Sequence, residues 1–277
     1  MGRPLTLRFA KMSGAGNDFV LLDTTRRRNG RSTPARLGLA ALAKRLCDRR
    51  EGIGGDGLIH LSFGGRGSPR MRYFNADGSE AFCGNGTRCS AWWAHQSGRM
   101  RAREFTLLTQ AGDLRARIAG RERVAIRLPV PGIVSAPRLL SIGGRRLMVY
   151  FVDTGVPHAV VETADLGRFP VHEIGRALRR HPIFKPAGAN ADFVAFGRRE
   201  IAVRTYERGV EDETLACGTG AAAAALVGLH LGKCRSPVSV RVKSGARLRV
   251  HVETGDDPAE LWLEGPARTV YQGSIRL

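Results

Sequence analysis

The 277-residue sequence has no long hydrophobic run and few cysteines. No stretch approaches the roughly 20 consecutive apolar residues that a membrane-spanning helix needs, so we expect no helical membrane protein. Residues 1–11 lack the apolar centre of a signal peptide, which predicts a protein that is not exported. The 5 cysteines form an odd set, which favours reduced thiols in the cytoplasm over a disulfide framework.

The sequence also lacks the spacings that are typical of metal and nucleotide sites. It has no Cys-x-x-Cys pair, and His95, His158 and His230 stand at no zinc-ligand spacing to the cysteines. Residues 52–57 match Gly-x-Gly-x-x-Gly, but they follow an expected helix and precede an expected strand, the reverse of a dinucleotide-binding site. We therefore expect neither a metal ion nor a cofactor.

Acidic residues are scarce beside the basic ones: 25 Asp and Glu stand against 44 Lys and Arg, a formal net charge of +19. Such a balance can indicate nucleic-acid binding. The basic residues are, however, scattered along the chain and form no stripe interleaved with aromatic residues. Because charge alone gives only non-specific affinity, nucleic-acid binding is not the expected function. A basic binding protein without catalysis stays open as an alternative.

The pattern of apolar residues and turn residues predicts an α+β fold rather than a regular alternation of strands and helices. In the first half we expect strands near 5–9, 19–22, 58–61, 105–118 and 122–128, and a helix from Thr33-Pro34 to about Arg50. Pro129, Pro131 and Pro137 mark a crossover into the second half. There we expect helices at 171–180 and 219–231, and strands near 147–152, 192–196, 201–206, 238–242, 246–252, 260–263 and 268–277.

An internal repeat relates the two halves. Residues 14–20 resemble 188–194, and residues 72–75 with 80–86 resemble 204–207 with 213–220. Each copy ends in Cys-Gly-x-Gly, at Cys83 and at Cys217, directly before an expected helix. A duplicated half-chain would place two thiols across a pseudo-two-fold axis, and a ligand would bind in the cleft between the halves.

The start of a helix is the reason why Cys-Gly-x-Gly can carry chemistry. The first N–H groups of a helix have no partner within it, so they can bind a carboxylate. The same positive end lowers the pKa of a neighbouring thiol. A thiolate and a thiol on opposite sides of a carboxylate-bearing carbon are what a two-base inversion requires. Cys47, Cys89 and Cys234 lack this setting, so we expect them to be small buried hydrophobic residues.

At these residues the sequence resembles the diaminopimelate epimerases, enzymes that interconvert L,L- and meso-diaminopimelate without pyridoxal phosphate. Four segments match in the family's order: 11–19, 75–89, 155–158 and 207–220. The resemblance implies two pseudo-symmetric lobes, each a barrel-like, mostly antiparallel sheet around a central helix. The lobes would be 1–128 plus 266–277, carrying Cys83, and 129–265, carrying Cys217, with the active site in the cleft between them. It also implies a homodimer in lysine and peptidoglycan precursor biosynthesis.

The resemblance assigns a role to each matching residue. Cys83 and Cys217 would be the catalytic pair, and His158 would support the site. The substrate-binding residues would be Gly84, Asn85, Gly218 and Thr219 at the reacting carboxylate, Glu207 at the reacting amino group, and Asn17, Asn75, Asn190 and Arg208 on the rest of the substrate. Arg208 is a natural partner for the distal carboxylate. Val156 stands where many members have an Asn that reads the distal end of the substrate.

Related two-cysteine enzymes are the nearest alternatives. A histidine racemase or a hydroxyproline epimerase shares the proton chemistry but does not need to bind a second, distal α-amino acid centre. The set Asn75, Asn190 and Arg208 favours diaminopimelate over these substrates.

Overall fold

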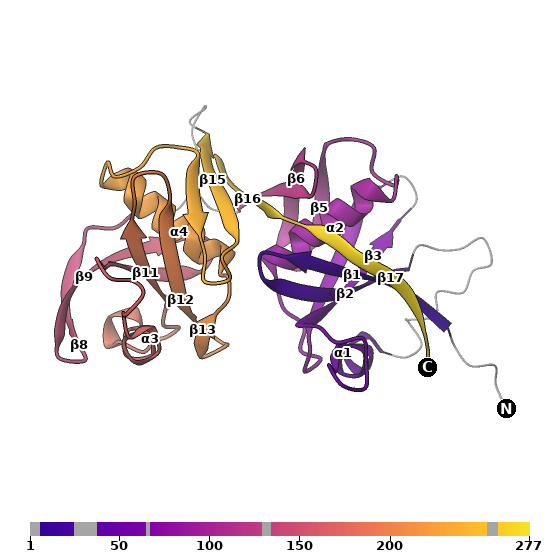
Figure 1. Cartoon of the computed structure of the whole chain (residues 1–277), viewed down its shortest axis with the longest axis horizontal. Coiled ribbons are helices and arrows are strands. Elements are labelled where there is room, and N and C mark those ends of the chain that lie inside the picture. The colour runs from indigo at the N-terminus through magenta and orange to yellow at the C-terminus, as the bar shows by residue number, and fades with distance from the viewer. Residues whose placement is uncertain (1–5, 25–37, 65–66, 129–133, 254–259) are drawn as a thin grey trace. The chain divides into compact units, whose positions relative to one another are not determined.

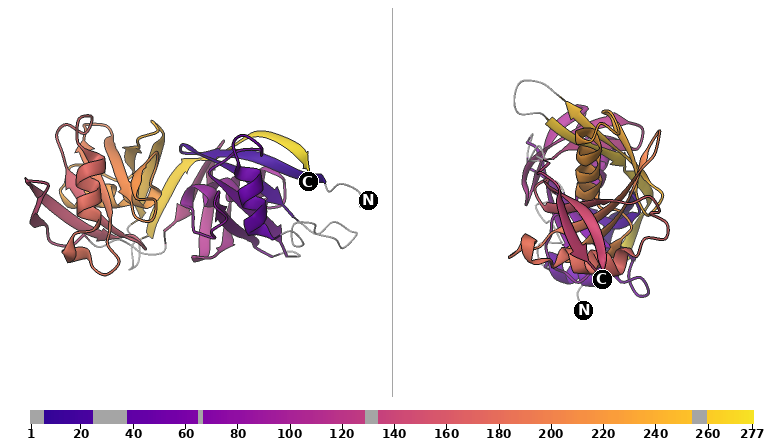
Figure 2. Two further views of the ribbon diagram at one scale, coloured as in Figure 1. Left: turned by 90° about the horizontal axis from the view of Figure 1, so that it is seen from below. Right: turned by 90° about the vertical axis from the view of Figure 1, so that its left-hand side faces the viewer.

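The computed structural model describes residues 6–24, 38–64, 67–128, 134–253 and 260–277. The chain divides into two compact units (Figures 1 and 2). Unit 1 comprises Met1–Ile126 and Gly265–Leu277, and unit 2 comprises Arg127–Glu264. Each unit is a sheet of mostly antiparallel strands with a helix running through it, so the predicted α+β fold is confirmed. None of the helices in the described ranges is long and apolar enough to cross a membrane.

Unit 1 builds its sheet from both ends of the chain. Its elements are β1 (Thr6–Gly14), β2 (Asn17–Asp23), α1 (Leu39–Cys47), β3 (Gly57–Phe63), β4 (Pro69–Asn75), α2 (Gly84–Gln96), β5 (Glu104–Thr109), β6 (Gly112–Gly120), β7 (Arg123–Arg127) and β17 (Arg268–Arg276). The strands pair in the order β17-β1-β2-β3-β4-β5-β6-β7. The pairs β2–β3 and β4–β5 are parallel, and the other pairs are antiparallel.

Unit 2 repeats this order of pairings. Its elements are β8 (Arg138–Ile142), β9 (Arg145–Asp153), β10 (Pro157–Glu162), α3 (Val171–Arg179), the 3₁₀ helix η2 (Pro182–Phe184), β11 (Asn190–Phe196), β12 (Ile201–Glu207), β13 (Asp212–Thr214), α4 (Gly218–His230), β14 (Val238–Arg241), β15 (Arg247–Glu253) and β16 (Glu260–Pro266). The order is β8-β9-β10-β11-β12-β14-β15-β16, with β10–β11 and β12–β14 parallel. The internal repeat that the sequence shows is therefore a repeat of the fold.

The helices α2 and α4 are the central helices of their units, and their burial explains their composition. In unit 1, α2 packs against β1, β4, β6 and β17, while α1 packs against β2, β3 and β4. Strand β2 contacts both helices, so Phe19, Val20, Leu21 and Leu22 are all buried and do not alternate. In unit 2, the five consecutive alanines 221–225 of α4 are fully buried, because small side chains let the helix lie close to the surrounding strands.

The sequence misses some strands. β4, β8, β10 and β13 are present but are not among the expected strands. β8 is an edge strand with largely exposed side chains, and the turn residues before Pro157 hide the start of β10. The expected helix near 34–50 is observed as Leu39–Cys47, and it ends before Arg50. Its expected start at Thr33-Pro34 lies outside the described residues, as do Leu5, Pro129 and Pro131.

Candidate active site

Cys83 and Cys217 occupy equivalent positions at the starts of the two central helices. Each is the N-cap residue of its helix, with extended backbone angles of φ −139° and ψ 109° at Cys83 and φ −110° and ψ 113° at Cys217. The N–H of Gly86 donates to Cys83 Sγ at 3.4 Å, and the N–H of Gly220 donates to Cys217 Sγ at 3.4 Å. The sequence prediction that each cysteine directly precedes a helix is confirmed.

The Cys217 thiol is buried, with 6% of the residue exposed. Burial raises its pKa well above the usual value, and the carboxylates of Glu207 and Asp192 raise the pKa further. The hydroxyl of Thr219, 3.5 Å from the sulfur, and the N–H of Gly220 lower it, but by less. The expectation that the helix start gives a low thiol pKa is therefore wrong for Cys217, because desolvation outweighs the helix terminus.

A buried polar cluster in unit 2 lies against the first turn of α4, the helix that Cys217 caps. His158 and Asp192 are fully buried, and His158 Nδ1 lies 2.6 Å from Asp192 Oδ2. The other carboxylate oxygen accepts a hydrogen bond of 2.7 Å from the hydroxyl of Thr205. A Cβ atom on Gly220 would lie 2.2 Å from Asp192 Oδ1. Glycine at this position therefore lets the start of α4 approach the Asp192 carboxylate.

Three further predicted site residues of unit 2 are buried or partly buried polar groups. His158 Nε2 is buried and has no hydrogen-bond partner among the described residues. Burial raises the pKa of the nearby Glu207 carboxyl above its ordinary value. Asn190 is 4% exposed, and its side-chain oxygen accepts the backbone N–H of Arg208 at 2.7 Å. With that oxygen engaged, the Asn190 amide offers N–H donors to a ligand.

In unit 1, the predicted residues Asn17 and Asn85 form one hydrogen-bonded row. The Asn85 amide donates to Asn17 Oδ1 at 2.6 Å, and the Asn17 amide donates to Asp56 Oδ2 at 2.9 Å. Asn75, at the end of β4, pairs with Gly57 next to Asp56, but its amide donates to Ser79 Oγ at 2.9 Å and not into this row. The structure therefore brings Asn17 and Asn85 together beside the start of α2, and it ties Asn75 to a turn.

The other cysteines differ from the pair. Burial raises the pKa of Cys47 to about 11 and that of Cys89 to about 12, so these thiols stay neutral. Their expected role as small buried residues is confirmed, with 2% and 0% exposed. Cys234 is only partly buried, so that expectation holds less well there. Cys234 follows the end of α4, and its Sγ lies 3.8 Å from the carbonyl oxygen of Ala225 in that helix.

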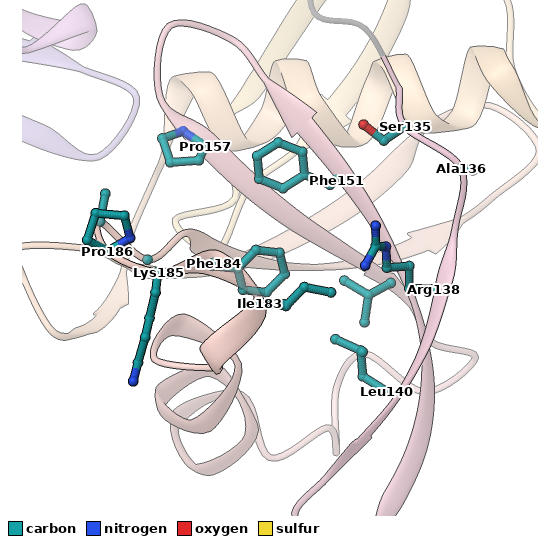
Figure 3. Close-up of a pocket in the computed structure, with 13 residues that line it drawn as sticks. Ser135, Ala136, Arg138, Leu140, Phe151, Pro157, Ile183, Phe184, Lys185 and Pro186 are labelled. Carbon is teal, nitrogen blue, oxygen red and sulfur yellow. The ribbon is translucent and has the colours of Figure 1, made fainter.

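A groove of about 360 Å³ in unit 2 contains none of the predicted site residues (Figure 3). It lies between the β8–β9 hairpin on one side and η2 with the segment after it on the other, and it is largely apolar. The rings of Phe151 and Phe184 stack in it with centroids 5.8 Å apart.

Val156, in the bend before β10, is half-buried, and its carbonyl accepts the N–H of Thr154 at 3.1 Å.

Three charged residues of these networks were not singled out from the sequence, namely Asp56, Asp192 and Arg88. Asp192 is the buried partner of His158, and its signal was its place inside the repeated segment 188–194. Arg88 is fully buried in α2 and bonds Asn85, but the sequence shows it as one Arg among many. Among the described residues, no three His, Cys, Asp or Glu side chains form a metal-binding group.

Comparison with known proteins identifies the family. The sequence pattern of diaminopimelate epimerases matches residues 9–128 and 150–270. The diaminopimelate epimerase of Chlorobaculum tepidum is 40% identical over 274 residues, which cover 96% of this chain and 100% of that protein. The one of Desulforudis audaxviator is 39% identical over 284 residues, which cover 96% and 98%. A phenazine biosynthesis protein of the PhzF family from Enterococcus faecalis shares the fold, with a TM-score of 0.71 at 16% identity over 99% of this chain and 100% of that one. This chain belongs to the diaminopimelate epimerase family.

Proposed function

We propose that this chain interconverts L,L- and meso-diaminopimelate by proton exchange at one α-carbon, with Cys83 and Cys217 as the two proton carriers. The observation that carries the proposal is the matched pair of cysteine N-caps on the two central helices. Family membership, at 40% identity to a diaminopimelate epimerase, supports the substrate. The enzyme would act in lysine and peptidoglycan precursor biosynthesis.

The reacting carboxylate would bind at the helix starts. Gly84 and Asn85 open α2, and Gly218 and Thr219 open α4. Their N–H groups have no acceptor within the helix, and the positive end of each helix favours an anion. As the α-proton leaves, negative charge moves onto the carboxylate, and these donors stabilise it. The helix starts thus supply electrostatic stabilisation of the carbanion, and we propose that no cofactor is needed.

The thiols would act from opposite faces of the α-carbon. One, as thiolate, removes the proton while the other, as thiol, delivers a proton to the other face. The raised pKa of Cys217 suits the role of proton donor in the resting enzyme. After one turnover the protonation states of the pair are exchanged, and the reverse reaction starts from that state. The mechanism needs both thiols reduced, which fits the cytoplasm.

The remaining predicted residues would orient the substrate. Glu207 and the His158 ring, whose buried Nε2 has no partner among the described residues, would meet the reacting amino group. Asn190 would donate through its amide, because its oxygen already accepts the N–H of Arg208. The guanidinium of Arg208 would pair with the distal carboxylate, and Asn17 and Asn75 would hold the substrate from unit 1. Val156 offers no side-chain donor at the distal end, so backbone groups would act there.

We expect the purified protein to exchange the α-proton of diaminopimelate in deuterated water and to leave histidine and 4-hydroxyproline unchanged. A substrate without a distal α-amino acid centre would leave the polar groups that bind this centre without hydrogen-bond partners, which costs binding free energy. Deuterium incorporation, followed by NMR at equal substrate concentrations, measures this directly. Exchange with histidine or hydroxyproline but not with diaminopimelate would assign the chain to another two-thiol activity.

We also propose that the enzyme is a homodimer. β17 carries exposed apolar side chains, with Val270 53% and Tyr271 47% exposed, and these would favour contact with a second copy. Light scattering after size exclusion should give twice the mass of the 30.0 kDa chain. A mass of a single chain at micromolar concentration would rule out a stable dimer.

A further inference from the structure

The guanidinium of Arg88 is buried inside unit 1, where both the lack of solvent and the nearby helix start disfavour a positive charge. Arg88 is 0% exposed and lies in the first half of α2, whose N-terminal end is itself positive. Burial lowers its pKa to about 10. Its Nε and Nη1 atoms have no hydrogen-bond partner among the described residues. A buried, incompletely paired cation costs free energy of folding, so its presence calls for a compensating role.

The one side-chain hydrogen bond of Arg88 in the described part of the chain goes to the predicted substrate-binding residue Asn85. Its Nη2 donates to Asn85 Oδ1, because side chains on a helix lean toward its N-terminus and reach the preceding turn. Asn85 donates to Asn17 at 2.6 Å, and Asn17 donates to Asp56 at 2.9 Å. Arg88 is therefore the first member of the row that includes Asn85 and Asn17.

The two ends of this row fix how both amides point. A guanidinium can only donate hydrogen bonds, and a carboxylate can only accept them. With Arg88 at one end and Asp56 at the other, each amide must turn its oxygen toward Arg88 and its NH₂ group toward Asp56. One N–H of each NH₂ group serves the row. Among the described residues the second N–H of Asn85 and of Asn17 has no acceptor, so it can donate to an anion.

The charge of Arg88 also acts on the thiol at the start of α2. Among the described residues, the thiols of Cys89 and Cys83 raise the pKa of the Arg88 guanidinium through their charge, and the cation of Arg123 lowers it. Cys89 stays neutral because burial raises its pKa to about 12. Tyr73, which faces Cys83 from β4, also stays neutral because burial raises its pKa far above the ordinary value. Of the described groups that act on Arg88, Cys83 is therefore the one whose ionised form can compensate the buried cation.

Unit 2 has the opposite arrangement at the matching place. By the repeat, Ala222 takes the position of Arg88, five residues after the cysteine. The charged group against the start of α4 is instead the carboxylate of Asp192, next to Gly220. A cation on one side and an anion on the other make two similar helix starts electrostatically unlike.

We propose that Arg88 is a positioning residue, which orients the Asn85 and Asn17 amides to donate N–H groups to the substrate carboxylate and supplies the positive charge beside which Cys83 ionises. The proposal rests on the proposed function. It assigns the resting thiolate to Cys83 and leaves Cys217 as the thiol. Both effects come from one side chain, and different substitutions separate them.

The kinetic test compares Arg88→Met, Arg88→Lys and the exposed control Arg70→Met. Arg88→Met should lower kcat/KM for diaminopimelate by about 100-fold, with a raised KM, because the amides lose their fixed orientation. Arg88→Lys keeps a positive charge and an N–H donor but not the planar guanidinium. Its kcat/KM should therefore be about tenfold higher than that of Arg88→Met. Arg70→Met should change kcat/KM by less than about twofold.

The second readout is alkylation of Cys83 by iodoacetamide without substrate, followed against pH by mass spectrometry of the Cys83 peptide. Arg88→Met should move the midpoint to higher pH, and Arg88→Lys should restore it, because only the thiolate reacts. An unchanged midpoint and a kcat/KM within about threefold of wild type, in a folded Arg88→Met protein, overturn the proposal.

If Arg88→Met does not fold, Arg88→Gln decides the matter. Glutamine is neutral but can still donate an N–H to Asn85, so the alkylation midpoint should rise while KM changes little. An unchanged midpoint in Arg88→Gln overturns the charge role. If the wild-type enzyme does not turn over diaminopimelate, the proposed function fails, whereas the alkylation result still tests Arg88, because it uses no substrate.

Discussion

Replacing either Cys83 or Cys217 by serine is expected to lower the rate of diaminopimelate epimerisation by at least about 1000-fold. A serine hydroxyl does not ionise near neutral pH and is a far weaker proton carrier than a thiol. In the proposed mechanism each direction of the reaction uses one thiolate and one thiol, so the loss of either sulfur should affect both directions. The measurement is the formation of the meso isomer from pure L,L-diaminopimelate, followed by chromatography of chiral derivatives.

Cys234→Ser provides the matched control. Cys234 is partly buried like Cys83, but it lies after the end of α4 and caps no helix. This variant should keep the wild-type rate within about twofold. All three serine variants should unfold within about 1 kcal/mol of wild type, because a hydroxyl has as many heavy atoms as a thiol and can make the same hydrogen bonds. If Cys83→Ser and Cys217→Ser remained active, the two-thiol mechanism would be wrong. A basic binding protein would also be insensitive to both changes.

The sequence predicts the two cysteine positions because their signal is local. Cys-Gly-x-Gly before a helical run specifies a tight helix start, and the structure places Cys83 and Cys217 at N-caps with matching hydrogen bonds. The repeat predicts two similar halves, and the order of strand pairings confirms this. Short motifs and a long-period repeat can thus be read without knowing which segments meet in space.

The partners of these motifs could not be predicted, because they depend on contacts between distant segments. Asp18 and Asp192 align in the repeat, yet Asp18 binds Lys11 at 2.6 Å and is partly exposed, whereas Asp192 is buried against His158. Burial also reverses the expected pKa of Cys217. In both cases the surroundings in the folded chain decide the electrostatics, and sequence position alone does not report them.

Replacing Asp192 by alanine is expected to destabilise unit 2 by about 3–5 kcal/mol, because the change removes one partner of a buried, hydrogen-bonded group. His158 Nδ1 and the Thr205 hydroxyl would both lose their acceptor, at distances of 2.6 and 2.7 Å in the folded protein. Asp192→Asn keeps the volume and one acceptor, so it should cost about half as much. Urea unfolding followed by circular dichroism gives the free energy of unfolding for each variant.

Asp165→Ala is the control for this prediction, since Asp165 belongs to the same unit and its side chain is 62% exposed. It should change stability by less than about 0.5 kcal/mol. A loss below about 1 kcal/mol for Asp192→Ala would show that the His158–Asp192 contact adds little to the folded state. Asp192→Ala should also lower kcat by more than unfolding of the protein explains. The reason is that Asp192 lies against Gly220, at the start of the helix whose N-cap is Cys217. In Asp192→Ala at 10 °C, where the variant stays folded, kcat should therefore fall while the folded fraction does not, as a displaced thiol requires.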